Sequence, residues 1–185
     1  MQGDMDVWRK AHTETYELAS ECLQTNYYGA KKTTEALISL LQLSDSPRIV
    51  NISSEMGRLQ HVRNEWATGL LSDIHSPTED TIDEILRLFL AVLKDDTLES
   101  KGWPTFLSAY IISKAAMNAL TRILANKYPE FRINCLNPGF LKTDMTNNRG
   151  FMSAEKAAAN PVNLELLPRG GPSGLFFTLD EESSF

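Results

Sequence analysis

The feature that most constrains the fold of this chain is an alternation between long helical patterns and short β-branched runs. Apolar residues recur at helical spacing from about Glu14 to Gln42, and the run RIVNIS at 48–53 follows the turn-forming SDSP. Further strand candidates are FRINCLNPG at 131–139 and GLFFTLDE at 174–181. Short buried runs separated by helices are typical of parallel strands with helical crossovers. We therefore expect an α/β fold with a doubly wound parallel sheet of about three strands.

Residues 58–106 interrupt this alternation with a charged, helix-prone stretch. Within it, SPTEDTIDEILRLFLAVLKD offers Ser or Thr as a capping residue, then acids, then an apolar stripe. We expect 58–106 to be a mostly helical insertion inside a domain that spans 1–185. Near the end of the chain, SAEKAAANPVNLELLP is expected to be a helix weakened by Pro161, and the tail DEESSF is expected to be merely polar.

Composition excludes several classes of protein. The formal net charge is −6 and no basic cluster occurs, which argues against nucleic acid as a partner. No apolar run reaches the roughly 20 residues of a membrane span or the form of a signal peptide, so no membrane association is expected. Cys22 and Cys135 show no metal-binding spacing and are expected to be reduced. A cytoplasmic location is expected.

Two chemically useful side chains, Tyr110 and Lys114, lie four positions apart in SAYIISKAAMNALTR, a segment with strong helix propensity. Positions i and i+4 share a helix face, and a nearby ammonium favours the ionised phenol, so the pair is suited to proton exchange. The alternative interpretation is that Tyr110 lies on the surface beside a solvated Lys114, since such a pair can have the same spacing. The neighbouring alanines would let this helix approach a sheet or a cofactor closely.

Other candidates lie at the predicted carboxyl ends of strands, where parallel sheets bind ligands. Ser53 and Ser54 follow the first strand, as two turn serines or as donors to a substrate oxygen. Pro138 and Gly139 form the turn after the second strand, where glycine allows close backbone approach. Asn26 lies inside the first helix, as an irregularity or as a functional amide.

Together these segments resemble the short-chain dehydrogenase/reductase family. Asn26 in TNYYGAK, Ser54 in ISSEMG, and Tyr110 with Lys114 in YIISK match the family's Asn-Ser-Tyr-Lys tetrad in order and context. NPGFLKT matches its nicotinamide-side turn, and TNYYGAKKTTEAL, LQLSDSPRIVNISS and GGPSGLFF resemble the plant menthone/neomenthol and salutaridine reductases. The insertion resembles that of the monomeric carbonyl reductases.

The resemblance implies a Rossmann-like fold and an NADPH-dependent carbonyl reductase or alcohol dehydrogenase. Tyr110 would be the general acid, Lys114 would assist it and hold the nicotinamide ribose, and Ser54 would bind the substrate oxygen. Asn26 would hold a water linked to Lys114. The nicotinamide would be lined by the segment after the second strand, at Pro138, Gly139, Leu141 and Thr143. The substrate would be a small hydrophobic ketone or alcohol between apolar walls at Trp66, Leu70, Leu71 and Phe151. A full-length protein would be a monomer.

The sequence also departs from this family. No G-x-G occurs, and GGPSG precedes a strand instead of following one, so the phosphate-binding turn is missing. The chain is therefore expected to lack the amino-terminal, dinucleotide-binding half and to keep the catalytic half. The alternative function is a truncated, non-catalytic fragment that acts as a binding partner or has no activity.

Overall fold

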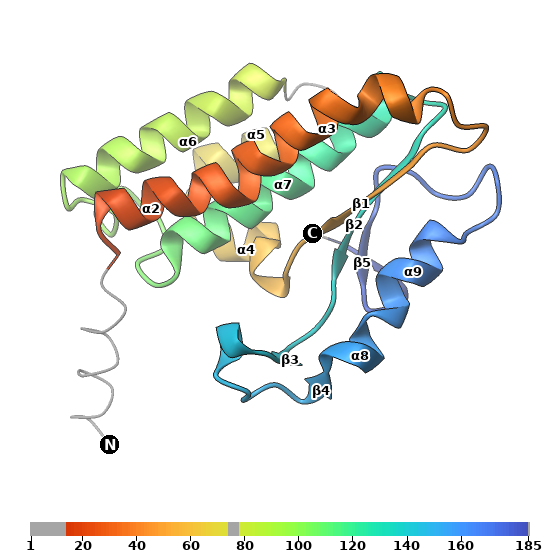
Figure 1. Ribbon diagram of the computed structural model, residues 1–185. Helices are drawn as coiled ribbons and strands as arrows, with labels where there is room; N and C mark the ends of the chain where they lie inside the picture. Colours follow the sequence, from red (N-terminus) through yellow and green to blue (C-terminus); the bar gives the residue numbers. More distant parts are fainter. Residues whose placement is uncertain (1–13, 74–77, 185) are drawn as a thin grey trace.

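The computed structural model describes residues 14–73 and 78–184. It is an α/β structure in which helices cover both faces of a central sheet (Figure 1). The sheet has the order β1-β2-β5-β6, and a separate short pair is formed by β3 and β4. The strands are β1 (Arg48–Ile52), β2 (Arg132–Asn137), β3 (Leu141–Lys142), β4 (Met152–Ser153), β5 (Phe176–Thr178) and β6 (Glu181–Ser183).

The three expected strands are confirmed, and they run parallel. β1 pairs with β2 in the register Asn51 opposite Cys135, and β2 pairs with β5 in the register Leu136 opposite Phe177. The helices are α2 (Tyr16–Leu23), α3 (Gly29–Leu41), α4 (Leu59–Val62), α5 (Glu65–Ser72), α6 (Glu79–Lys94), α7 (Ser108–Lys127), α8 (Ala154–Ala157) and α9 (Ala159–Glu165). Crossovers through helices explain the parallel pairing, as the alternation in the sequence predicts.

Helices α2 and α3 form one long rod because a π-helical turn, Gln24–Tyr28, joins them without a break (Figure 1). Thr15 caps the start of the rod by accepting a hydrogen bond from the backbone N–H of Leu18 at 3.3 Å. The expected helical pattern over 14–42 is therefore confirmed. The irregularity of the rod lies in the π-helical turn, and Gly29 is the first residue of α3.

Helix α7 is the centre of the larger core. It packs on β2 and is surrounded by α2, α4, α5 and α6, so nearly all of its side chains are buried. The expected helices within 58–106 are present as α4, α5 and α6. Thr78 caps α6 in a reciprocal pair with Thr81, and Glu79 and Asp80 follow in the first turn. The other capping candidate, Ser76, lies outside the described residues.

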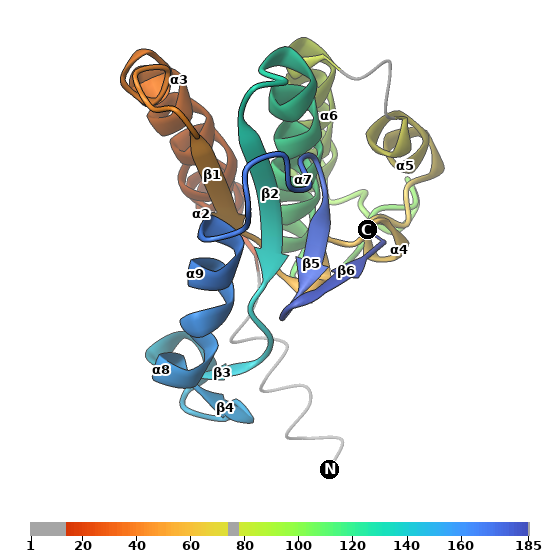
Figure 2. The same cartoon turned by 90° about the vertical axis from the view of Figure 1, so that its right-hand side faces the viewer.

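A smaller apolar cluster lies on the other face of the sheet, under α9. Leu136, Leu164 and Phe177 are buried there, and Val50 packs against them. Figure 2 shows α9 and α8 on this side, away from α3 and α7. The sheet is therefore covered on both faces, as a doubly wound fold requires.

Two expectations for the end of the chain were wrong in detail. The predicted helix over 153–168 is two short helices, because Pro161 has no N–H to donate to the carbonyl of Ala157. Pro161 falls in the first turn of α9, where a missing N–H costs little. The polar tail contains β6, which pairs antiparallel with β5, and Phe177 lies opposite Glu182.

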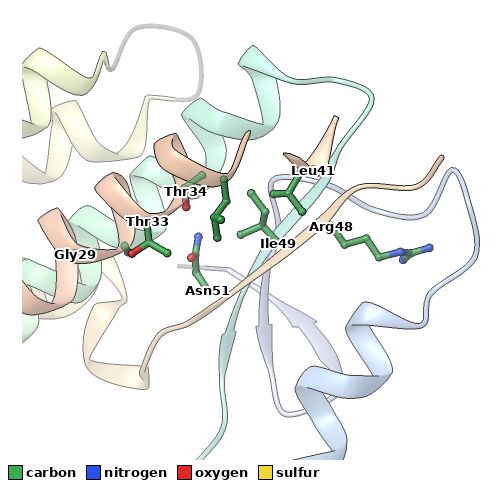
Figure 3. A pocket seen from close by; sticks show the side chains of 9 residues that line it. Gly29, Thr33, Thr34, Leu41, Arg48, Ile49 and Asn51 are labelled. Atoms are coloured by element: carbon green, nitrogen blue, oxygen red, sulfur yellow. The ribbon is translucent and has the colours of Figure 1, made fainter. Parts of the chain in front are cut away.

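Strand β1 is an edge of the sheet and lies beside a hollow of about 350 Å³ against α3. Figure 3 shows Thr33, Thr34 and Leu41 of α3 facing Ile49 and Asn51 of β1 across this hollow. Leu37 on α3 and Ile52 on β1 are each 44% exposed. An open strand edge beside exposed apolar side chains is a surface prone to association.

Candidate active site

A cavity of about 910 Å³ lies at the carboxyl ends of β1 and β2, between those ends and the rod formed by α2 and α3. The structure brings every residue expected to act in catalysis or to bind the cofactor to this cavity: Asn26, Ser54, Tyr110, Lys114, Pro138, Gly139, Leu141 and Thr143. These residues come from four separate parts of the chain. Their convergence follows from the parallel sheet, since the carboxyl ends of its strands meet at one edge.

Tyr110 and Lys114 share one face of α7, as their spacing predicts. The Lys114 Nζ atom lies 5.8 Å from the centroid of the Tyr110 ring and donates a hydrogen bond to the carbonyl of Ile52 at 2.9 Å. Lys114 is 9% exposed, and this burial lowers the pKa of its ammonium below the usual lysine value. The lysine is therefore a buried cation at the base of the cavity and not a solvated surface group.

The two serines after β1 have different surroundings. Ser53 is buried and donates a 2.6 Å hydrogen bond to the amide oxygen of Asn118 on α7. Ser54 accepts a hydrogen bond from the backbone N–H of Met56 at 3.2 Å. As an acceptor in that bond, the Ser54 hydroxyl keeps its own proton for a ligand.

The turn after Ser54 packs tightly on α7 through Gly57. A Cβ atom added at Gly57 would lie 2.9 Å from the Cβ of Lys114 and 3.0 Å from the amide nitrogen of Asn118. Asn118 in turn donates to the carbonyl of Gly57 at 3.1 Å. A glycine at position 57 therefore lets the serine turn approach the helix that carries Tyr110 and Lys114.

Asn26 lies in the π-helical turn and is directed toward α7. Its amide nitrogen donates to the Ser113 hydroxyl at 3.0 Å and contacts the Cys22 sulfur at 3.5 Å. The Ser113 hydroxyl donates to the carbonyl of Tyr110 at 2.8 Å. The expected helix irregularity at Asn26 is therefore present, and the π-helical turn directs the amide toward α7.

The turn after β2 is fixed by Asn137. Its side-chain oxygen accepts a hydrogen bond from the backbone N–H of Gly139 at 3.0 Å. Gly139 has φ of +86°, a left-handed conformation that glycine adopts without strain. Pro138 and Gly139 thus hold backbone against the cavity, and β3 continues from this turn with Leu141.

Sequence reasoning missed several lining residues and misplaced others. The cavity is also lined by residues from the rod of α2 and the π-helical turn, namely Leu18, Glu21, Cys22 and Thr25. Further lining residues are Met56, Leu107, Asn137, Phe140, Met145 and Thr146. Helical spacing from Asn26 could have found Cys22. The four residues expected as substrate walls, Trp66, Leu70, Leu71 and Phe151, do not line this cavity. Leu71 is buried in the main core, Leu70 packs against it, and Phe151 is 90% exposed beside Phe140.

The residues around the cavity fit one end of a dinucleotide. The Lys114 ammonium has three donors, so besides Ile52 it can bind ribose hydroxyls, and backbone at Gly139 can approach a flat ring. Within 14–73 and 78–184, no glycine-rich turn leads from a strand into a helix, so these residues do not supply a pyrophosphate cradle. The part of the chain that the structure describes also contains no metal-binding cluster and no helix able to span a membrane.

Comparison with known proteins defines the class. A family model described as enoyl-(acyl carrier protein) reductase matches residues 96–169. The (+)-neomenthol dehydrogenase of Arabidopsis thaliana is 52% identical over 179 residues, which are 96% of this chain and 60% of that protein. Short-chain dehydrogenase/reductase 1 of Saponaria officinalis is 54% identical over 172 residues, which are 93% of this chain and 57% of that protein. The structure of salutaridine reductase from Papaver somniferum, 51% identical, superposes with a TM-score of 0.86 over 90% of this chain and 56% of that one.

The fold is part of a Rossmann-like α/β fold, as in the structure of salutaridine reductase. Over nearly its whole length the chain is similar to proteins of the short-chain dehydrogenase/reductase family, and these similar proteins include plant reductases. It spans between half and two thirds of the length of these relatives.

Proposed function

We propose that this chain forms the catalytic part of a carbonyl reductase that uses NADPH to reduce a small hydrophobic ketone. The observation that supports this most is the placement of Tyr110, Lys114 and Ser54 around one cavity at the carboxyl edge of the sheet. Such a site offers a proton donor, a cation and a hydroxyl to a carbonyl oxygen, which are the groups that reduction of a ketone requires.

In this mechanism the ketone oxygen lies between Tyr110 and Ser54. The Ser54 hydroxyl donates a hydrogen bond to it, and this bond strengthens as negative charge develops on the oxygen. Tyr110 then donates its phenolic proton to that oxygen as general acid. Alcohol oxidation would use the same groups in reverse, with Tyr110 accepting the proton.

Lys114 stabilises the phenolate that Tyr110 leaves behind, because its ammonium lies near the ring. Asn26 holds a water that connects Lys114 with solvent, so that the proton is replaced; the contact of its amide with Ser113 keeps it beside α7. Pro138, Gly139, Leu141 and Thr143 line the nicotinamide, which supplies the hydride when bound. NADPH is favoured because a relative named carbonyl reductase [NADPH] 3, from Mus musculus, is 33% identical over 158 residues.

The substrate class follows from the cavity walls. Leu18, Met56, Leu107, Phe140 and Met145 give the cavity an apolar surface that would exclude water from a bound ketone. The names neomenthol dehydrogenase and salutaridine reductase belong to relatives of about half identity, and they favour a terpenoid or alkaloid ketone for this chain too.

The remaining features of the proposal concern organisation. Residues 1–185 are the catalytic part of one reductase domain, and 58–106 is a helical insertion within it that covers α7. We propose that the complete reductase is a monomer, because α7 is already buried by helices of its own chain. A cytoplasmic location agrees with two cysteines that are both free.

A second candidate function is a non-catalytic fragment that binds another protein. The observation that favours it is the open edge of β1 with the apolar hollow against α3, a surface that another polypeptide strand could cover. In this case the residues of the cavity would record ancestry and not activity.

The two candidates are separated by a chimera, here called the reductase chimera. It joins the nucleotide-binding segment of Papaver somniferum salutaridine reductase to this chain. The proposal expects the chimera to bind NADPH, measured by nicotinamide fluorescence, and to oxidise it when menthone or a similar ketone is added. A folded chimera that binds NADPH but reduces none of a panel of terpenoid and alkaloid ketones would contradict the proposed function and favour the binding fragment.

A further inference from the structure

The helix that carries Tyr110 begins in an unusual way. The residue before it, Leu107, has φ of +49° and gives no side-chain cap, although α7 starts directly after it at Ser108. The first backbone N–H groups of a helix have no partner within the helix and need one from outside. Tyr110 is the third residue of α7, so the proton donor of the proposed reaction lies within this first turn.

Glu14 supplies the missing partner from 94 positions earlier in the chain. One carboxylate oxygen accepts from the backbone N–H of Ser108 at 2.9 Å and from its hydroxyl, and the other accepts from the N–H of Ala109 at 3.1 Å. Ser108 is fully buried. The negative charge also lies at the positive end of the helix dipole, where it is stabilising. A single side chain therefore fixes the first turn of α7.

Glu14 also lies next to the start of α2, the helix that forms the opposite wall of the cavity. Thr15, the next residue, caps α2, which contributes Leu18 to the lining, while Leu107 contributes from the start of α7. Glu14 and Thr15 thus fix the starts of two helices that face each other across the site. A shift at Glu14 would move the wall with Leu18 relative to the turn with Tyr110.

We propose that Glu14 is a positioning residue that holds Tyr110 at its place for proton transfer. The inference rests on the proposed reductase function for its catalytic meaning, but the placement of the Tyr110 ring is a property of the chain itself. A misplacement of a reacting group by about 1 Å can cost up to roughly 100-fold in rate, so a capping residue outside the cavity can control turnover.

The experiment compares Glu14→Ala and Glu14→Gln with a matched control, Glu17→Gln. Glu17 is exposed in the first turn of α2, so the control removes the same charge nearby without touching α7. Two quantities are measured. The first is the fluorine NMR spectrum of the reductase chimera labelled with fluorotyrosine, in which Tyr110 is assigned by its loss in Tyr110→Phe. The second is kcat and KM of the same variants in the reductase chimera.

Glu14→Ala is expected to shift or broaden the Tyr110 resonance and leave that of Tyr128, at the far end of α7, unchanged. In the chimera, kcat should fall about 10-fold while KM for the ketone changes less than about two-fold. Glu14→Gln keeps one acceptor oxygen and should show a smaller change in the same direction. Glu17→Gln should match wild type in both measurements.

An unchanged Tyr110 resonance in Glu14→Ala, or an unchanged kcat in an active chimera, overturns the proposal. If Glu14→Ala does not fold, Ser108→Ala replaces it. This substitution removes one of the three hydrogen bonds to Glu14 and keeps the two from backbone N–H groups. It must then change the Tyr110 resonance and kcat in the same direction, by less than is expected for Glu14→Ala. If the wild-type chimera binds NADPH but reduces no ketone, the proposed function fails, and the fluorine spectrum alone decides whether Glu14 positions Tyr110.

Discussion

The ammonium nitrogen of Lys114 lies 5.8 Å from the centre of the Tyr110 ring. The two side chains leave the same face of α7, and the lysine is held from behind by the carbonyl that ends β1. The sheet therefore fixes the cation and the helix fixes the phenol. The proposed chemistry depends on both elements, and each can be tested separately.

Tyr110→Phe removes the phenolic hydroxyl and little else. In the reductase chimera this change should lower kcat by about 100-fold or more, because general acid catalysis contributes that much. The half-buried ring keeps its packing, so the unfolding midpoint should stay close to that of the parent. Turnover at the parent rate would rule out Tyr110 as the general acid.

Lys114→Met tests the buried charge through stability. Burial lowers the pKa of Lys114 in the folded chain below the ordinary value of 10.5. At a pH between the folded-state pKa and 10.5, the unfolded chain therefore binds more protons than the folded chain. The contribution of Lys114 to folding stability must therefore rise as pH increases toward 10.5 and be lower at neutral pH. Urea unfolding of parent and variant chimera over this range should show the difference moving in favour of the parent as pH rises. A difference that stays constant with pH would contradict burial of the charge.

The two cysteines should react with iodoacetamide in a fixed order. Cys22 lines the cavity, and burial raises the pKa of its thiol, so alkylation should be slow near neutral pH and faster as pH rises. Cys135 is buried in β2 with a pKa raised to about 12 by burial, and it should react after unfolding. Mass spectrometry of the native chain checks the order. A hydrophobic ketone bound in the cavity should protect Cys22 from alkylation. Faster labelling of Cys135 than of Cys22 would contradict the burial of Cys135 in β2.

The reductase chimera should be a monomer. Helix α7 is covered by α2, α4, α5 and α6, which leaves little of its surface for a second copy. Sedimentation velocity should give one species whose mass does not change with concentration. A stable dimer at low concentration would contradict this prediction. It would show that a surface other than α7 mediates assembly.

The chain without the nucleotide-binding segment should self-associate and show little ketone reduction. Its β1 edge and the apolar hollow beside α3 remain open to another molecule. Leu37→Lys places a charge at the border of this hollow and should increase solubility several-fold, as charged residues do at strand edges. Leu43→Lys is the control, since Leu43 is 82% exposed and lies beyond α3. An equal gain from both substitutions would show that the hollow is not the surface involved.

Much of this structure follows from local patterns in the sequence. The β-branched run at Arg48–Ile52 and the apolar run at Arg132–Asn137 mark their strands because both are short and follow helical segments. The candidate site residues also come together in one cavity, since parallel strands bring Ser54 and Gly139 to one edge. What could be predicted is therefore set by periodicity and by the topology of the sheet.

Long-range partnerships could not be predicted in this way. The pairing of Glu14 with the start of α7 spans most of the chain, and no local pattern marks it. Strand β6 was missed because Glu181–Ser183 is polar and is ordered by pairing with β5 and by Arg58, which donates to the carbonyl of Ser184 at 2.9 Å. The apolar character of Leu70 and Leu71 was interpreted as a substrate wall, although Leu71 is buried in the main core and Leu70 packs against it.

The π-helical turn at Gln24–Tyr28 also limits how the coding sequence can change at this point. Such a turn holds one residue more than an α-helical turn, so α2 and α3 are out of phase by about 100°, the rotation of one residue. Losing a single codon within the turn would keep a continuous helix but swing either Asn26 away from Ser113 or Leu23 out of the core. A gap of one position here should therefore distinguish inactive descendants from working enzymes, even when every catalytic residue is retained.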